Sequence, residues 1–334
     1  MKTGKLSPAL LEKLLAKIDI KDERILLGPR IGEDAAAIQF GSKTLVVKTD
    51  PVTFATDLIG WYVVNVNAND VATMGAIPRW FLSTILLPES SNQQDVETIF
   101  NQIVTACSSL GITPVGGHTE TVFDLNRPIV VGCMLGETEQ RSVLTTAGAM
   151  VGDDIVLTKG IAIEGTAVLA REAKQSLLSA GISDKLINRA ADYLFSPGIS
   201  VLQEAQIACS TVEVHAMHDP TEGGLATGLT EIAVAARVGI SIEEEKIPLF
   251  PECRAICEGI SIDPLGLLAS GALLIVLPDT DTPGLLKELK EAEIKGTVIG
   301  KVVEAKEGVK LQTATGTRDF PQFERDELAR FLDS

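Results

Sequence analysis

The chain has 334 residues, 45% of them hydrophobic but only 4% aromatic, and its 29 basic and 45 acidic residues give a formal net charge of −16. Such an acidic chain is a poor partner for nucleic acid or an anionic membrane surface, so we expect neither. A bound phosphate would have to be held by backbone N–H groups or a metal ion, because the sequence has no basic cluster. At roughly 100–200 residues per domain, the length predicts two domains.

Targeting signals and cysteines favour a cytoplasmic protein. Five scattered cysteines indicate reduced thiols, and Cys253 and Cys257 are expected to be neighbours on a helix rather than zinc ligands. The N-terminal stretch reads as an amphipathic helix with Ser7 as N-cap, not as a signal peptide. Residues 58–87 are the most apolar stretch, but three asparagines and an aspartate interrupt them, so we reject a membrane-spanning helix.

The first half of the chain predicts alternating strands and helices. Strands are expected at 44–50, 79–88, 112–117 and 127–137, and helices at 57–75 and 92–110. This order is β-α-β-α-β-β, an α/β layer whose sheet has one open face to cover.

The second half restarts after a turn-rich segment at 145–154. We expect strands at 154–160, 211–217 and 271–278, helices at 164–181 and 184–194, a glycine-rich helix start at 219–236 and a short helix near the C-terminus. The predicted domains are therefore 1–148 and 149–305, followed by a polar tail at 306–334.

Four acidic residues stand next to predicted strand or helix edges, where ligand sites gather in α/β layers. They are Asp34 in "IGEDAAAI", Asp50 in "VVKTDPV", Asp70 in "NANDVATMGA" and Glu120 in "GGHTE". Hard carboxylate oxygens suit Mg²⁺, so these four are the candidate metal ligands. Asp70 lies in an apolar helix, where an isolated carboxylate is costly, and it could instead be a structural aspartate that caps or hydrogen-bonds within the core.

A fifth candidate is "HDPTEGGLA", residues 218–226. Asp219 as N-cap, Pro220 at the first helical position and Glu222 two residues later have capping-box spacing, and Gly223 would let a ligand approach the backbone. This pattern predicts either an anion or metal–phosphate site at a helix N-terminus or simply a capped helix. His215 and His218 are three apart on a predicted strand and face opposite sides, which argues against a shared metal. "TKGIAIEGTAVLA" (158–170) is another strand, turn and helix start, for which a structural role is equally possible.

Taken in order, "IGEDAA", "KTDPV", "NANDVATMGAIP", "GGHTE" and "HDPTEGGLA" resemble the PurM-like superfamily over residues 28–305. Among its members the chain is most similar to the hydrogenase maturation factor HypE and the AIR synthase-related proteins. The resemblance implies a two-domain PurM-like α/β (α+β) fold: an N-terminal sheet-and-helix domain that forms a barrel with a second copy, and a C-terminal α/β domain. It also implies ATP and Mg²⁺ as cofactors.

The resemblance assigns roles to individual positions. Asp34, Asp50 and Asp70 would hold metal on the triphosphate, and Asn69 and Thr119 would lie beside the nucleotide, with Asp219 and Thr221 closing the site. The expected nucleotide-binding set is completed by Gly32, Thr49, Gly116, Gly117 and Gly223. No catalytic nucleophile is assigned.

Two features depart from the family pattern. His118 stands where many relatives have an acidic residue, and a neutral imidazole is a poor Mg²⁺ ligand. HypE uses a C-terminal cysteine as carbamoyl acceptor, whereas this chain ends "RFLDS" and its last cysteine is Cys257. The sequence therefore predicts an ATP-dependent enzyme acting on a small substrate by phosphoryl transfer. The alternative hypotheses are a nucleotide-binding accessory protein that works with a maturation-protein partner in metallocentre assembly, and a homologue whose site has decayed.

Overall fold

The computed structural model describes residues 6, 8–30, 35–52, 57–139 and 143–333. By the density of its internal contacts the chain divides into two compact units. One unit comprises Ile18–Pro29 and Glu33–Val143, and the other comprises Met1–Lys17, Arg30–Gly32 and Leu144–Ser334. We describe each unit by itself.

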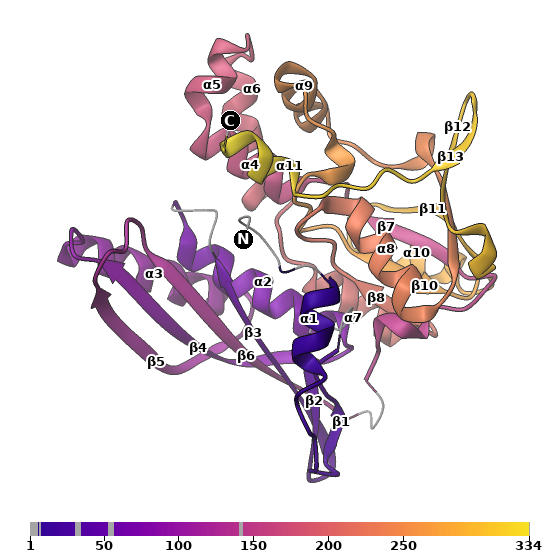
Figure 1. The fold of residues 1–334 in the computed structure, drawn as a ribbon, viewed down its shortest axis with the longest axis horizontal. Helices are drawn as coiled ribbons and strands as arrows, with labels where there is room; N and C mark the ends of the chain where they lie inside the picture. The colour runs from indigo at the N-terminus through magenta and orange to yellow at the C-terminus, as the bar shows by residue number, and fades with distance from the viewer. Residues whose placement is uncertain (1–5, 7, 31–34, 53–56, 140–142, 334) are drawn as a thin grey trace. The chain divides into compact units, whose positions relative to one another are not determined.

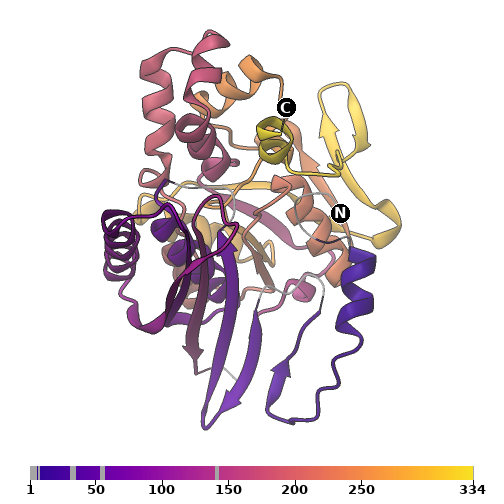
Figure 2. The ribbon, with the colours of Figure 1, turned by 60° about the vertical axis from the view of Figure 1, so that its left-hand side comes forward.

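The first unit is a mixed sheet with two helices on one face (Figures 1 and 2). Its elements are β1 (Ile25–Leu27), β2 (Ala36–Phe40), β3 (Lys43–Val52), α2 (Ile59–Thr73), β4 (Ile77–Pro88), α3 (Gln93–Ser109), β5 (Thr113–Val122) and β6 (Ile129–Thr138). The strand order is β1-β2-β3-β6-β4-β5, with β4 and β5 parallel and the other pairs antiparallel. The predicted β-α-β-α-β-β order is confirmed from β3 to β6, and the structure adds β1 and β2 before it.

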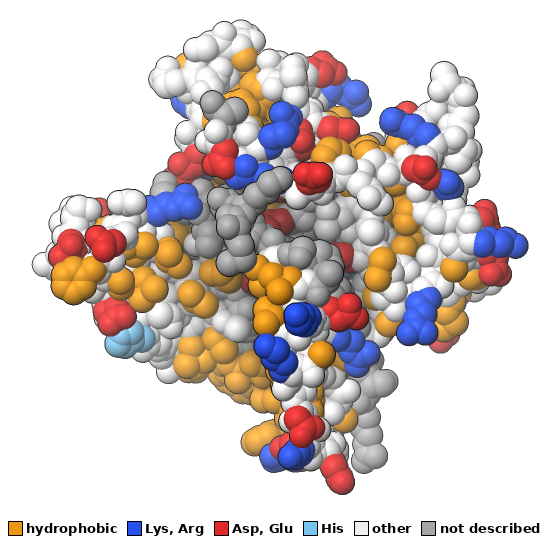
Figure 3. Space-filling view, in the orientation of Figure 1, with side chains coloured by type: hydrophobic (Ala, Val, Ile, Leu, Met, Phe, Trp, Pro, Cys, Tyr) orange, Lys and Arg blue, Asp and Glu red, His pale blue; other side chains and the backbone are white. Residues whose placement is uncertain are grey.

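Glycines in β6 let α2 lie directly on the sheet. A Cβ at Gly132 would lie 2.4 Å from the side chain of Asn67, and one at Gly136 would lie 2.3 Å from Val71. Residues of β6 alternate between buried positions facing α2 and half-buried positions on the opposite face. That opposite face carries hydrophobic side chains such as Trp80, which is 38% exposed, and Figure 3 shows hydrophobic side chains gathered over this sheet.

The second unit is built around a larger sheet of order β13-β12-β9-β11-β7-β10-β8. Its strands are β7 (Asp154–Thr158), β8 (Ala216–His218), β9 (Gly239–Glu243), β10 (Leu274–Leu277), β11 (Gly296–Val303), β12 (Val309–Thr313) and β13 (Gly316–Asp319). Its helices are α1 (Pro8–Leu15), α4 (Ile163–Glu172), α5 (Lys174–Ser179), α6 (Asp184–Ala191), α7 (Leu202–Thr211), α8 (Gly224–Ala236), α9 (Pro251–Ile260), α10 (Thr282–Glu291) and α11 (Glu327–Leu332). In the part of the chain that is described, no helix combines the length and apolar character that a membrane crossing requires.

Three predictions for the second unit were wrong. The helix expected at 164–181 is two helices, α4 and α5, and the strand expected at 211–217 is only β8, preceded by the unpredicted α7. β8 has three residues and lies at the edge of the sheet, where it pairs with β10 over three positions. The polar tail contributes β12 and β13 to the sheet before the expected short helix α11.

Candidate functional site

Two of the predicted metal ligands meet at one lysine in the first unit. Lys48 and Asp50 lie two apart on β3, so both side chains point to the face that carries α2. The Lys48 Nζ atom lies 3.1 Å from Asp70 Oδ2 and 3.8 Å from Asp50 Oδ2. The Asp70 side chain is only 4% exposed, whereas that of Asp50 is 41% exposed. The buried carboxylate therefore has a cation beside it, and the exposed one faces solvent.

Neighbouring asparagines hold α2 against β3. The Asn67 side-chain amide donates to Val63 O at 2.8 Å within the helix and to Asp50 O at 3.2 Å on the strand. Asn65 donates to Trp61 O one turn earlier. Both buried asparagines have structural partners, and the bond from Asn67 to β3 fixes where α2 presents Asp70. Asn69 is buried on the same helix.

Glu120 lies elsewhere in the unit. It is on β5, at the edge of the sheet, and pairs with Leu86, whereas Thr119 pairs with the buried Ile85. Paired residues share a face, so Thr119 is on the α2 face and Glu120 is on the opposite one. Within one chain Glu120 is thus separated from Asp50 and Asp70, and its nearest ionic partner is His118, 3.3 Å away between Nε2 and Oε2.

Strand packing explains the second glycine of the pair before His118. Gly117 has a φ of +154°, and a Cβ there would lie 2.0 Å from Ser83 O on the neighbouring strand. Asp50, Gly132, Ser83 and Gly117 are successive partners across four strands, which separates Asp50 from Gly117 by about 14 Å at about 4.8 Å per strand. Thr49 faces away from Asp50, and its hydroxyl donates to Gly132 O at 2.8 Å.

Gly32 and Asp34 lie outside the described residues. Among the residues that are described, no group of three or more His, Cys, Asp and Glu side chains could hold a metal ion. Asp50 and Asp70 nevertheless offer hard oxygen donors, and Mg²⁺ commonly takes one or two carboxylates and completes its shell with phosphate oxygens and water. The residues present therefore fit a magnesium ion shared with a phosphate ligand, but not an all-protein metal cage.

The second unit contains the "HDPTEGG" loop between β8 and α8, and the predicted capping box there is wrong. Helix α8 begins at Gly224, and its N-cap is Gly223 with φ +79° and no capping side chain of its own. A Cβ on Gly224 would lie 2.6 Å from Leu265 O, so this glycine is required by a close loop contact. Asp219, which was expected to be the N-cap, is buried at 2% exposure, four residues before the actual one.

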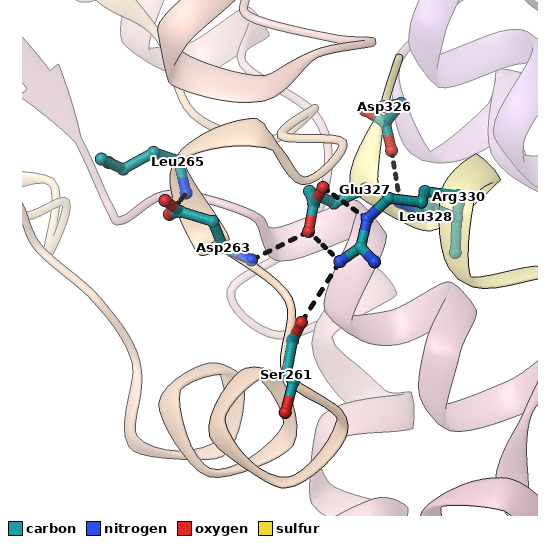
Figure 4. A network of polar contacts seen from close by, with 7 residues as sticks. All are labelled: Ser261, Asp263, Leu265, Asp326, Glu327, Leu328 and Arg330. Carbon is teal, nitrogen blue, oxygen red and sulfur yellow. Dashed lines mark hydrogen bonds and ion pairs between the residues drawn. The ribbon is translucent and has the colours of Figure 1, made fainter. Parts of the chain in front are cut away.

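The C-terminal segment supplies the missing hydrogen bond at the start of α8. Asp326 Oδ2 accepts from Gly223 N at 2.7 Å, and its Oδ1 accepts from Leu328 N at 2.7 Å. Glu327 accepts from Asp263 N at 3.0 Å and pairs with Arg330, which also donates to Ser261 O (Figure 4). Helix α11 is thus fixed to the loops that follow α9 and precede α8.

Three carboxyl groups surround this junction. Burial, reinforced by the charges of Asp326 and Glu222, raises the pKa of Glu164, on α4, to about 7. Burial also raises the pKa of Asp326 to about 6, although backbone N–H groups of Gly223, Leu328 and Leu268 oppose the shift. This end of the second unit is therefore strongly acidic and partly protonated near neutral pH.

The two histidines near this loop bind different carboxylates, as their spacing predicted. His215 Nδ1 lies 2.8 Å from Asp153 Oδ2, and His218 Nε2 lies 2.9 Å from Glu231 Oε2. Lys159 of the "TKGIAIEG" stretch forms a buried ion pair with Glu204 at 2.7 Å and donates to Ser200 O. These contacts give the stretch a structural role in joining β7 to α7.

The thiols are poorly suited to nucleophilic chemistry. Cys253 and Cys257 are buried on α9, with 3.9 Å between their sulfur atoms, as expected for a helical pair. The hydrogen bond between the two sulfur atoms and burial raise the pKa of Cys257. Burial raises the pKa of Cys107 and of Cys209 to about 11. Both are therefore protonated, and so weakly nucleophilic, at neutral pH.

Two family models match the chain: the N-terminal domain of AIR synthase related protein at residues 32–138, and its C-terminal domain at 150–312. The chain belongs to the AIR synthase related family. Among the curated proteins of this family, it is 26% identical over 324 residues to a putative hydrogenase expression/formation protein of Methanocaldococcus jannaschii, covering 94% of this chain and 93% of that one. It is 27% identical over 283 residues to carbamoyl dehydratase HypE of Rhizobium leguminosarum bv. viciae, covering 82% and 78%.

Solved structures confirm the PurM-like fold of this AIR synthase related chain. The HypE–HypF complex matches with a TM-score of 0.75 at 23% identity, covering 94% of this chain and 100% of the matched one. AaThiL complexed with AMPPCP and TMP matches with a TM-score of 0.72 at 22% identity, covering 94% of both chains. HypE in complex with ATP matches with a TM-score of 0.72 at 21% identity, covering 98% of both chains.

Sequence reasoning missed Lys48 and Asp326. Lys48 could have been found from its position two residues before Asp50, because side chains two apart on a strand share a face. Asp326 is more than 100 residues from Gly223, and nothing local in the sequence indicates that contact.

Proposed function

We propose that this AIR synthase related protein binds ATP with Mg²⁺ and transfers a phosphoryl group to an oxygen or phosphate of a small substrate. The observation that carries the proposal is the arrangement of Asp50 and Asp70 around Lys48. Asp50 lies on strand β3 and Asp70 on helix α2, and a hydrogen bond from Asn67 holds the helix to the strand. Support comes from the ATP and AMPPCP complexes of proteins with the same fold.

In this proposal each residue has a positioning or electrostatic role. Mg²⁺ bound by Asp50 and Asp70 would neutralise charge that develops on the phosphates. Lys48 keeps the two carboxylates close together, and Asn67 keeps α2 in register with β3. Asn69, Thr49 and Thr119 of the first unit, and Asp219, Thr221 and Gly223 of the second, remain the proposed nucleotide-binding residues. Asp34 and Glu120 remain proposed metal ligands, and Glu120 could reach such a site only from another chain.

A second candidate function is an accessory role in hydrogenase maturation without carbamoyl dehydration by this chain. It is favoured by the relatives named HypE and by the likeness to the HypE–HypF complex. In that case a maturation protein would be its partner and ATP turnover by the chain alone would be slow.

Calorimetric titration with Mg-ATP tests the proposed site. Asp50→Asn and Asp70→Asn should each weaken Mg-dependent binding at least about tenfold, because each removes a negative charge that offsets a dication. Asp95→Asn, an exposed capping residue of α3, is the control. Unchanged affinity in both site variants would remove these residues from the site. Identifying the products of ATP with candidate amides and phosphates then separates phosphoryl transfer from an accessory role.

A further inference from the structure

The ammonium group of Lys48 occupies the position that a metal cation bound by Asp50 and Asp70 would take. Its Nζ atom is 3.1 Å from the buried Asp70 carboxylate and 3.8 Å from that of Asp50, and its own side chain is 15% exposed. A divalent cation that bound both carboxylates would lie within a few ångströms of this ammonium group. At that distance two cations repel one another strongly, so metal and lysine compete for the same negative charge.

We propose that Lys48 is a specificity-determining residue of the proposed ATP site. Its ammonium group acts as an internal counter-ion and so determines how tightly the site binds metal cations from solution. Without metal, Lys48 neutralises one of the two carboxylates and holds them together. When Mg²⁺ binds Asp70, the ammonium group moves from that carboxylate to the nucleotide phosphates. The claim that Lys48 binds nucleotide phosphates rests on the proposed function. The claim that Lys48 competes with a metal ion for the carboxylates concerns only residues of this chain.

The charge count makes the consequence specific. Two carboxylates and one ammonium have a net charge of −1, so a single divalent cation already makes the group positive. Removing the ammonium leaves −2 and favours metal uptake. A site that keeps its lysine should therefore bind a free divalent cation weakly and bind it mainly together with a polyanion such as ATP.

The test uses the full chain, Mn²⁺ alone and ATP in EDTA as separate probes. Lys48→Met removes the charge but keeps most of the apolar stem, and Lys48→Arg keeps the charge. Lys43→Met is the matched control, because Lys43 lies on the same strand and pairs with Glu137 and Glu139 instead. We expect Lys48→Met to bind free Mn²⁺ about tenfold more tightly and metal-free ATP about tenfold more weakly, with Lys48→Arg and Lys43→Met close to the wild type.

Asp70→Asn gives a second, independent reading if Lys48→Met does not fold. It frees Lys48 from its buried partner, so metal-free ATP should bind more tightly than to the wild type even though Mg-dependent binding falls. Unchanged or weaker Mn²⁺ binding by folded Lys48→Met would overturn the inference, as would a loss of metal-free ATP binding in Asp70→Asn. If no variant and no wild-type sample binds ATP, the proposed function fails, and the Mn²⁺ titration alone still decides the role of Lys48.

Discussion

Replacing Glu164 by glutamine should change how stability depends on pH. The carboxyl group is buried at 7% exposure, and burial together with the charges of Asp326 and Glu222 raises its pKa from 4.5 to about 7. A raised carboxyl pKa means that the folded state holds the proton more tightly than the unfolded state does. The stabilisation is therefore fully present below pH 4.5 and is lost as the pH rises through about 7.

The magnitude follows from the two pKa values. At about 1.36 kcal/mol per pKa unit, the difference between 4.5 and about 7 corresponds to about 3 kcal/mol of unfolding free energy. Glutamine is neutral at every pH and has nearly the same size and shape as the glutamic acid that it replaces. Relative to the wild type, Glu164→Gln should therefore gain about 3 kcal/mol between pH 4.5 and pH 8.

Urea unfolding followed by far-ultraviolet circular dichroism at several pH values measures this difference. Glu172→Gln removes a carboxylate from the exposed face of the same helix and should stay within about 0.5 kcal/mol of the wild type at each pH. Parallel stability curves for the wild type and Glu164→Gln from pH 4.5 to pH 8 would refute the reasoning, because they would show that Glu164 titrates alike in the folded and unfolded chain.

Three further outcomes are expected. Asp326→Ala should lower the free energy of unfolding by about 1–3 kcal/mol and speed hydrogen exchange at Gly223, because the buried Gly223 N–H loses its acceptor. The control, Asp333→Ala, loses only an exposed ion pair with Arg325 and should have little effect. Incubation with a carbamoyl-transferring partner and ATP should leave no carbamoyl or cyano adduct by intact-protein mass spectrometry, and a stable adduct on any cysteine would restore a HypE-type reaction. Sedimentation equilibrium should show a homodimer that covers the apolar sheet face around Trp80 and Leu82, so a monomer at micromolar concentration would contradict that proposal.

The sequence by itself determined the first unit and the family. The local hydrophobic pattern predicts the order of its elements, because its strands are long and its helices α2 and α3 are periodic. The string "NDVATMGA" identifies the superfamily. The burial of Asp70 also follows from sequence, because no other residue of its helix, Ile59–Thr73, is charged. Local signals failed where an element depends on a distant partner, as for β8, which pairs only with β10, more than 50 residues further along the chain.

Only the tertiary structure decided which charges meet. The strand register places Glu120 on the opposite face from Asp50, and the packing of α2 on β6 brings Asp70 to Lys48. The start of α8 likewise takes its hydrogen bond from Asp326, 103 residues further along the chain, and not from the nearby Asp219. The physical reason is common to these cases. Backbone propensity acts over a few residues, whereas the partner of a buried charge is chosen by whichever side chain the packed fold brings within hydrogen-bonding distance.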